Sequence, residues 1–427
     1  MTTTDTARAQ AVRRAAATPL SARIPEVPGI LDATEVAATA ASIAEVQRPD
    51  GMIPWFPGGH CDPWNHVEAA MALTVGGLLD EARLAYRWLV DIQLPEGAWF
   101  NYYLTGTGVK DPRLDTNVCA YLATGAWHHF LVTGDAELLG ELWPTVERGL
   151  DFVLRWQQPD GTVLWSVDPD GRPGRYALLT GSSSIYHAVR CGVACAEALG
   201  LERPDWELAA GRLGHAVARL PGSFEPKQEF AMDWYYPVLS GALQGVDAER
   251  RIDQGWDTFV MDGLGVRCVS TNAWVTAAET AECVLALDAV GRRDRAVDLL
   301  TWAQAHRQPD GSYLTGIVYP DHSTFPFAER TTYTSAAVVL AADALSGATS
   351  AAGLFRGEGL PPGLDLSDAA EGAGGPAAGH GASLPAAPPP PPGTGRLGGR
   401  TRRSTRSDPQ AESSVNSPDL SAARYSS

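Results

Sequence analysis

The chain has 427 residues, of which 44% are hydrophobic and 19% are charged, and its formal net charge is −17. This length allows two or three average domains or one large helical domain. The negative charge argues against nucleic acid or an anionic membrane as the main partner, because binding phosphate groups requires a positive surface. A neutral or cationic ligand, or a site built from carboxylates, fits this charge better.

The two ends of the chain differ in composition from the middle. Residues 1–27 predict a flexible arm that lacks the apolar core of a signal peptide. Residues 347–427 are rich in Gly, Pro, Ala and Ser, so they cannot bury enough apolar surface to offset the entropy of ordering, and we expect a disordered tail. No apolar run reaches the ~18 residues of a membrane span. The six cysteines show no CxxC spacing, which favours buried thiols in a cytoplasmic protein.

Between the ends, two kinds of helical pattern alternate along residues 28–346. Six runs carry charge on one face, as an outer layer of helices does. Six others are rich in Ala, Gly and Val, which lets helices crowd around a centre; they start at His66, Thr116, Ser184, Trp234, Asn272 and Thr331. The alternation predicts an all-α protein with an (α/α)6 toroid of six helical hairpins, in which strands are scarce.

One four-residue phrase recurs between these runs. "RPDG" at 48–51 returns as "LPEG" at 94–97 and as "QPDG" at 158–161 and 308–311. The proline cannot continue the preceding helix, and the acid–glycine pair makes a turn. We therefore interpret the phrase as a turn between hairpins that carries no chemistry.

Acidic residues near the starts of the small-residue helices are the candidates for catalysis. In a toroid the loops that enter the inner helices form its open end, so acids there face a common space. Two suitably spaced carboxyl groups suffice for hydrolysis of a sugar bond, one as acid and one as base. N-capping is the alternative role for such acids, and Glu279 either pairs with a base such as Arg267 or lines a polar cavity. The predicted catalytic residues are Asp233 and Glu329, expected to face each other across the ring, with Asp115 and Glu279 as the second pair.

Aromatic and polar side chains near the same helix starts are the candidates for substrate binding. A carboxylate beside aromatic faces, as in "MDWYYP" at 232–237, is typical of a site for a sugar ring or a cation. The His and Cys spacings match no zinc motif, and we expect neither a metal nor a cofactor. The predicted substrate-binding residues are Asp62, Trp64, His66, Asn117, His187, Trp234, Tyr235, Arg267, Trp274 and Tyr333.

The segments "DPWNHVEAAMAL", "DTNVCAYLATGAWHHFLVTGD" and "MDWYYPVLSGAL" resemble two groups of helical toroids over about residues 28–345. One group is the six-hairpin glycosidases, including glucoamylase-like enzymes. The other is the terpenoid cyclases and prenyltransferases, and the chain most resembles actinobacterial proteins labelled prenyltransferase. The glycosidase resemblance implies a role for Asp115 after Leu114 and a catalytic base at Glu329. The chain departs from the glycosidase pattern where Ser166, and not Glu, follows Trp165. The DxDD and DDxxD motifs of the cyclases and prenyltransferases are absent.

These observations predict a carbohydrate-active toroid enzyme that uses paired carboxylates for glycoside-hydrolase-like acid–base chemistry on a glycan or glycoside. A sugar 2-epimerase is a variant of the same prediction. Two alternatives stay open: a prenyltransferase-like or cyclase-like enzyme acting on an isoprenoid, and a non-catalytic toroid that binds a glycan or lipid. The sequence does not indicate the oligomeric state.

Overall fold

The computed structural model describes residues 23–106 and 108–364 of the chain. Residues 1–22 of the arm predicted for 1–27, and residues 365–427 of the tail predicted for 347–427, lie outside these ranges. Within them, helices dominate and strands are two or three residues long. No helix in the described ranges combines the length and the apolar character that crossing a lipid bilayer requires.

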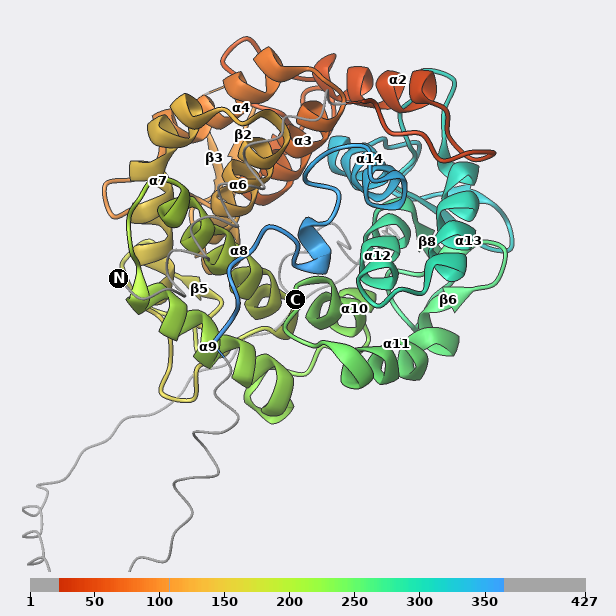
Figure 1. The fold of residues 1–427 in the computed structure, drawn as a ribbon. Coiled ribbons are helices and arrows are strands. Elements are labelled where there is room, and N and C mark those ends of the chain that lie inside the picture. The colour runs from red at the N-terminus through yellow and green to blue at the C-terminus, as the bar shows by residue number, and fades with distance from the viewer. Residues whose placement is uncertain (1–22, 107, 365–427) are drawn as a thin grey trace, which may run out of the picture. The chain divides into compact units, whose positions relative to one another are not determined.

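The helices form two concentric layers (Figure 1). The inner layer is a closed ring, since each inner helix contacts the next and the last contacts the first. The inner helices are α3 (Pro63–Val75), α5 (Thr116–Ala120) with α6 (Leu122–Thr133), α8 (Leu179–Ala198), α10 (Ala231–Leu239), α12 (Ala277–Ala289) and α14 (Thr332–Ser346). The outer helices are α2 (Ala33–Ala44), α4 (Leu79–Ile92), α7 (Ala136–Leu154), α9 (Pro204–Arg219), α11 (Gly245–Phe259) and α13 (Arg293–Ala303). This confirms the predicted (α/α)6 toroid.

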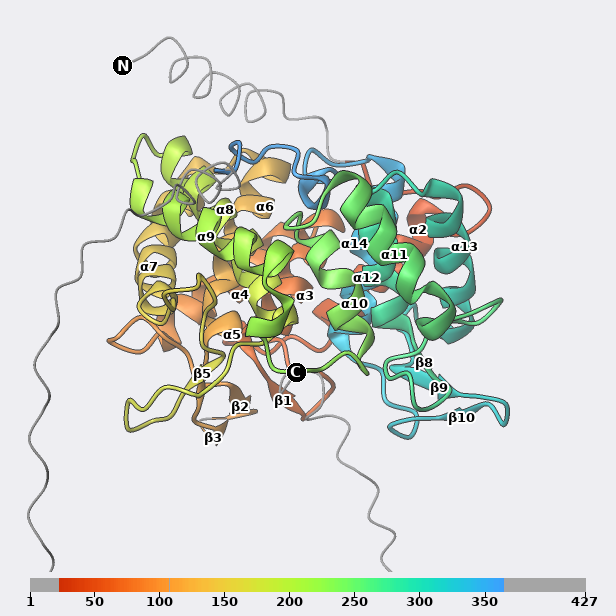
Figure 2. The same cartoon turned by 90° about the horizontal axis from the view of Figure 1, so that it is seen from below.

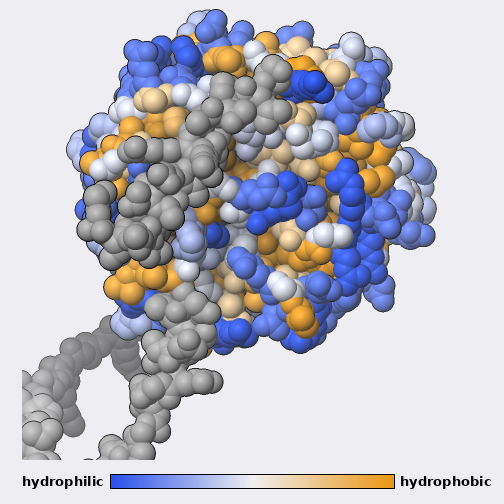
Figure 3. Space-filling model, viewed as in Figure 1, coloured by the Kyte–Doolittle hydropathy of each residue, from blue (hydrophilic) through white to orange (hydrophobic). Residues whose placement is uncertain are grey.

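Small residues allow the inner helices to approach closely. Every residue of α3, and every residue of α8 from Leu179 to Ala196, is buried. A Cβ added at Gly125 would lie 2.5 Å from Cγ1 of Val67 on α3. The outer helices are instead amphipathic and present hydrophilic side chains along much of the rim of the ring (Figure 3). The sequence pattern therefore separates the two layers correctly.

Short strands gather in the loops that lead into the inner helices, at one end of the ring (Figure 2). We call this end the mouth. One antiparallel sheet joins β1 (His60–Cys61), β2 (Tyr102–Leu104) and β3 (Val109–Asp111), with Cys61 opposite Tyr103. A second joins β8 (Trp274–Thr276), β9 (Gly316–Val318) and β10 (Ser323–Thr324). Two-stranded pairs join β4 (Leu114–Asp115) to β5 (Ser166–Val167) and β6 (Val260–Met261) to β7 (Gly265–Val266).

The recurrent acid–glycine phrase makes the turns between hairpins, as the sequence predicts. In the first copy Gly51 has φ +98°, and a Cβ there would lie 2.3 Å from the carbonyl oxygen of Leu84, so only glycine fits. The amide of Gln47 donates to the carbonyls of Gly51 and of Glu81 on the next outer helix. Gln93 and Gln157 make the same pair of bonds in the second and third copies. The phrase thus locks each turn to the following hairpin.

The ordered domain extends further at both ends than the sequence predicts. Residues 347–364, here called the closing segment, lie at the end of the ring opposite the mouth (Figure 2). They contain the 3-10 turn η3 (Leu354–Arg356), in which Leu354 and Phe355 are buried. The predicted boundary at 346/347 is therefore wrong, because these few apolar side chains suffice to anchor a segment of otherwise tail-like composition. At the other end Val27, assigned to the flexible arm, is buried and bridges to Leu31.

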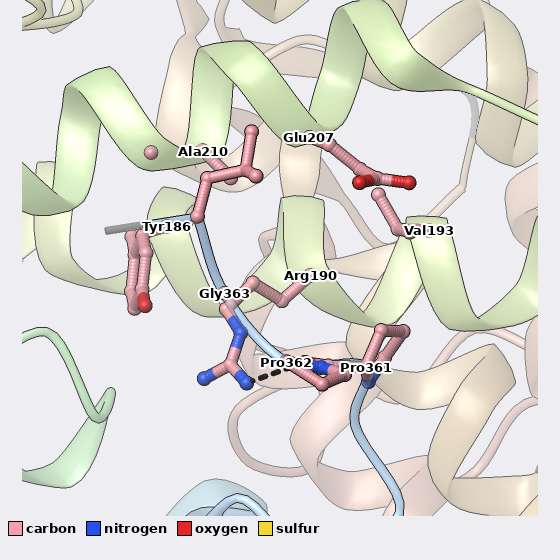
Figure 4. A pocket seen from close by; sticks show the side chains of 10 residues that line it. Tyr186, Arg190, Val193, Glu207, Ala210, Pro361, Pro362 and Gly363 are labelled. Atoms are coloured by element: carbon pink, nitrogen blue, oxygen red, sulfur yellow. Dashed lines mark hydrogen bonds between the residues drawn. The ribbon is translucent and has the colours of Figure 1, made fainter. Parts of the chain in front are cut away.

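Polar contacts also hold the closing segment. Arg190 on α8 donates from Nη2 to the carbonyl oxygen of Pro361 over 2.9 Å (Figure 4). Arg356 pairs with Asp288 on α12. Thr349 donates its backbone N–H to Asp343 on α14 over 2.9 Å. The segment thus connects three inner helices.

Truncation tests this correction of the boundary. A chain that ends at residue 346 should unfold at a clearly lower temperature, because burial of side chains such as Leu354 and Phe355 stabilises by about 1.5–3 kcal/mol each. A chain that ends at residue 366 keeps these contacts and serves as the matched control. Thermal unfolding followed by circular dichroism measures both. Equal midpoints for the two truncated chains would show that the closing segment adds no stability.

Candidate active site

Asp62 stands at the mouth, where it caps the first inner helix. Its Oδ1 accepts the backbone N–H of Asn65 over 2.9 Å, which satisfies a donor at the start of α3. Its Oδ2 accepts from Nε1 of Trp55 and from the side-chain amide of Asn65, each over 2.6 Å. The carboxyl group is buried, and burial raises its pKa although the three donors favour the charged form. Asp62 therefore joins the loop before α3 to the helix itself.

Asp115 caps the next inner helix in the same way. Its Oδ1 accepts the backbone N–H groups of Asn117 (2.8 Å) and Val118 (3.2 Å) at the start of α5. Burial is the main cause that raises the pKa of Asp115 to about 7; the bonds from Val118 and Asn117 and the nearby Arg113 oppose this rise, and the charge of Asp62 adds a smaller one. A carboxyl group with this pKa is about half protonated at neutral pH and can donate a proton.

Aromatic rings connect these two acids with the last inner helix. The ring of Trp55 meets Tyr102 edge-on at 5.9 Å and Tyr333 at 5.0 Å between centroids. Tyr102 has its pKa raised by burial and then by the charges of Asp62 and Asp115. Trp55, Asp62, Tyr102, Asp115 and Tyr333 are here called the mouth cluster. It combines carboxyl groups with aromatic surface.

Three more buried carboxyl groups come from α3 and α12: Glu68, Glu279 and Glu282. Glu282 on α12 accepts from the hydroxyl of Tyr235, and from that of Tyr236 over 3.2 Å. Glu282 and Glu68 of α3 both raise the pKa of Tyr121, after burial as the main cause. Glu279, one turn before Glu282 and also buried, accepts from the hydroxyl of Thr276. Carboxylates from α3 and α12 thus interact with tyrosine side chains in the interior of the toroid.

The order of the inner helices fixes which acids lie opposite each other. In a closed ring of six, α5 and α6 are opposite α12, and α3 is opposite α10 (Figure 1). Asp115 and Glu279 therefore start opposite helices. Only α12 separates α10 from α14. The predicted opposition of Asp233 and Glu329 is wrong for this reason.

Asp233 and Glu329 also have different surroundings from the mouth cluster. Asp233 accepts the hydroxyl of Thr180 over 2.6 Å, and its pKa is raised by burial. It lines a pocket on the flank of the ring together with residues of α11. Glu329 is half-buried in the loop before α14, where the hydroxyl of Thr315 approaches it at 3.4 Å.

The two predicted histidines are held inside the fold. His66 accepts the backbone N–H of Ile53 at Nδ1, and its Nε2 lies 2.8 Å from the carbonyl of Ala85, so both nitrogens have partners. Burial lowers the pKa of His66 to about 4. His187 stacks on Phe355 of the closing segment, and burial lowers its pKa to about 3. Both rings are neutral at physiological pH.

The aromatic residues predicted to bind substrate divide into two groups. Trp64 stacks on Tyr121 at 4.2 Å inside the ring, where Tyr235 also lies. Trp234 points to the outer layer, since its ring stacks on Phe259 and its Nε1 donates to the carbonyl of Arg251.

The remaining predicted residues hold loops at the mouth. Trp274 donates from Nε1 to the carbonyl of Phe325. Arg267 donates to the carbonyl of Ser270 over 3.5 Å. Asn117 lies against Gly181 of α8, because a Cβ added at Gly181 would lie 3.6 Å from the Cβ of Asn117.

The predicted site residues do not include Trp55, Tyr102 or Glu282. Trp55 and Tyr102 follow the first two copies of the turn phrase, in "MIPWF" and "AWFNYY", and this position was the available signal. Across residues 23–106 and 108–364, no group of three or more His, Cys, Asp or Glu side chains is arranged to hold a metal ion.

Comparison with known proteins gives one match in sequence. The chain is 50% identical over 342 residues to the MMP endo-(1,4)-3-O-methyl-alpha-D-mannosidase of Mycolicibacterium hassiacum, a match that covers 80% of this chain and 94% of that protein. No family model matches the chain.

Solved structures show the same fold. A glycosidase variant in complex with glucose superposes with a TM-score of 0.60 at 15% identity, over 75% of this chain and 100% of that one. A D-mannose isomerase superposes with a TM-score of 0.57 at 10% identity, over 72% of this chain and 96% of that one. These matches lend no support to the prenyltransferase alternative.

The raised pKa of Asp115 predicts how stability depends on pH. Because the folded-state pKa of about 7 lies above the unfolded value of about 3.9, the folded state binds more protons between these values. This contribution to the free energy of unfolding is complete below pH 4 and is lost as the pH rises through 7. Denaturant unfolding from pH 4 to 8 should show this loss, and Asp115→Asn should flatten it.

Asp205→Asn is the matched control for this measurement. The bonds from Arg203 lower the pKa of Asp205 on the outer helix α9, so its contribution is lost as the pH falls into the acid range. Between pH 4 and 8 this variant should keep the wild-type slope. An unchanged slope in Asp115→Asn would contradict the assignment.

Proposed function

Because the chain belongs to the family of the MMP endo-(1,4)-3-O-methyl-alpha-D-mannosidase of M. hassiacum, we propose that it hydrolyses internal 1,4-linkages between 3-O-methyl-α-D-mannosyl residues. The protein is a carbohydrate-active toroid enzyme of the glycoside hydrolase type. The main support for this reaction is the state of Asp115, a buried carboxyl group whose pKa of about 7 suits a proton donor at neutral pH.

The mouth cluster suits a methylated sugar. A methyl group on O3 removes a hydroxyl donor and adds apolar surface, so the substrate gains from contact with aromatic rings. Trp55, Tyr102 and Tyr333 supply such rings beside the two acids. The net charge of −17 also fits a neutral glycan better than a polyanion.

In the proposed reaction Asp115 donates its proton to the glycosidic oxygen as the bond from that oxygen to C1 breaks. Glu279, which starts the opposite inner helix, removes a proton from the water whose oxygen bonds to C1. The products are two shorter chains; Asp115 is left as a carboxylate and Glu279 carries the proton from water, and proton exchange with solvent restores both groups. We prefer this pair to Asp233 and Glu329, because those residues do not start opposite helices.

Asp62 has the role of a positioning residue in this account. Its bond from Trp55 holds the loop that carries the aromatic edge of the mouth cluster. Its charge also raises the pKa of Asp115. This effect is smaller than that of burial, which is the main cause of the raised pKa.

The test is hydrolysis of a 1,4-linked oligosaccharide of 3-O-methyl-α-D-mannose, with product lengths read by mass spectrometry. The wild type should release internal fragments and should act more slowly on the unmethylated oligosaccharide. Asp115→Asn and Glu279→Gln should each lower kcat by about 10²–10⁴-fold, the usual contribution of a general acid or base. Both variants should still fold, as judged by circular dichroism.

Glu141→Gln is the control for the loss of a carboxylate, because Glu141 forms a surface ion pair with Arg87 outside the mouth. It should retain wild-type turnover. Full activity in Asp115→Asn, together with inactivity in Glu329→Gln, would return the assignment to the pair predicted from the sequence.

A further inference from the structure

A cavity of about 440 Å³ opens on the flank of the ring, next to the mouth. Residues 221–228, between α9 and α10, form one wall, and the second half of α11 forms the other. The first turns of α8 and α10 close it with Leu179 and Asp233. We call this cavity the flank pocket. Its volume lies within the ~300–1,000 Å³ typical of sites for small ligands.

The apolar part of the flank pocket is aromatic. Trp234 stacks on Phe259 with centroids 5.5 Å apart and 14° between the ring planes. Phe224 and Leu179 add to the same lining. Such surfaces receive the C–H faces of a sugar ring or an O-methyl group.

A fixed guanidinium group supplies donors beside this aromatic surface. Arg251 donates from Nε to the carbonyl of Trp234 over 2.9 Å and from Nη2 to that of Asp233 over 2.6 Å. Within the described part of the chain, no hydrogen-bond acceptor is placed on its Nη1. These two backbone bonds hold the side chain rigid, so little entropy is lost when a ligand oxygen binds.

The charges in the flank pocket balance at its inner end. The carboxylate of Asp233 acts on Arg251, so donor and acceptor lie side by side without net charge. Glu225 and Lys227 also line the pocket, so its two acidic and two basic side chains balance. The amides of Gln228 and Gln254 add both donors and acceptors. This combination matches a neutral, hydroxylated ligand.

The flank pocket lies one inner helix away from the proposed proton donor. Asp115 accepts the N–H of Asn117, and Asn117 lies against Gly181 of α8. The residue before Gly181 is Thr180, whose hydroxyl binds the carboxylate of Asp233 in the pocket. A chain cleaved at an internal bond extends past the reacting groups, so part of it has to lie over neighbouring helices at the mouth.

We propose that the flank pocket is a distal subsite that binds a neutral hexose unit of the polysaccharide away from the cleaved bond. This inference rests on the proposed function, because it takes the ligand to be part of the same glycan. Distal binding of one unit increases the affinity for long chains. Short chains do not reach the pocket and so do not gain this affinity.

Thr258→Trp tests the subsite by filling it. Thr258 is an exposed residue of α11 that lines the pocket, so a larger side chain there occupies the cavity without disturbing the core. The ratio of kcat/KM for a long methylmannose oligosaccharide to that for a short one should fall about tenfold, through KM for the long chain. Asp257→Trp adds the same side chain one residue earlier, outside the lining, and should keep the wild-type ratio.

The possible results separate the two proposals. If the wild type cleaves both oligosaccharides and Thr258→Trp keeps the wild-type ratio, the subsite is wrong and the proposed function stands. If the wild type cleaves neither, the proposed function is wrong. Titration of the short and long oligosaccharides into the wild type and into Thr258→Trp then tests the pocket by itself. If the pocket binds this glycan, the variant should bind the long chain more weakly than the wild type does.

Discussion

The closed ring of inner helices is the constraint on which the rest of the structure depends. Six helices pack around one axis only where small residues permit close approach, as Gly125 does against Val67. All of them start at the same end, and the N–H groups of each first turn require an acceptor. Asp62 and Asp115 supply it for α3 and α5. Helix capping thus brings carboxyl groups together at the mouth.

Burial converts these caps into a chemically useful pair. A carboxyl group removed from water favours its neutral form, and a second acid nearby strengthens this effect. Asp62 receives three N–H donors, whereas Asp115 receives two, both at one oxygen. Burial raises the pKa of both groups, and the donors at each group oppose that rise.

The layers and turns could be predicted from the sequence because they follow from local rules. Periodicity separates inner from outer helices, and the acid–glycine phrase at Gly51 marks a turn that excludes any side chain. The predicted opposition of Asp233 and Glu329 failed because the inner helices follow one another around the ring in chain order, so the fourth and sixth are separated by a single helix and are not opposite. The orientation of Trp234 toward α11 was equally hidden, since a short inner helix is buried on all sides.

The closing segment shows a different limit of prediction. Composition averages over many residues, whereas anchoring needs only a few contacts, such as Phe355 on His187. The same holds for the mouth cluster, where Tyr102 reaches the acids through a sheet pairing of only a few residues. Interactions that join distant segments through single side chains leave little periodic signal in the sequence.

The pH dependence of kcat/KM for the wild type and Asp62→Asn tests the central claim most directly. If Asp115 is the proton donor, wild-type kcat/KM should fall as the pH rises through about 7, where the donor loses its proton. Removing the negative charge of Asp62 lowers the pKa of Asp115, so this fall should move to lower pH. A wild-type profile that stays flat between pH 6 and 8 would contradict the account.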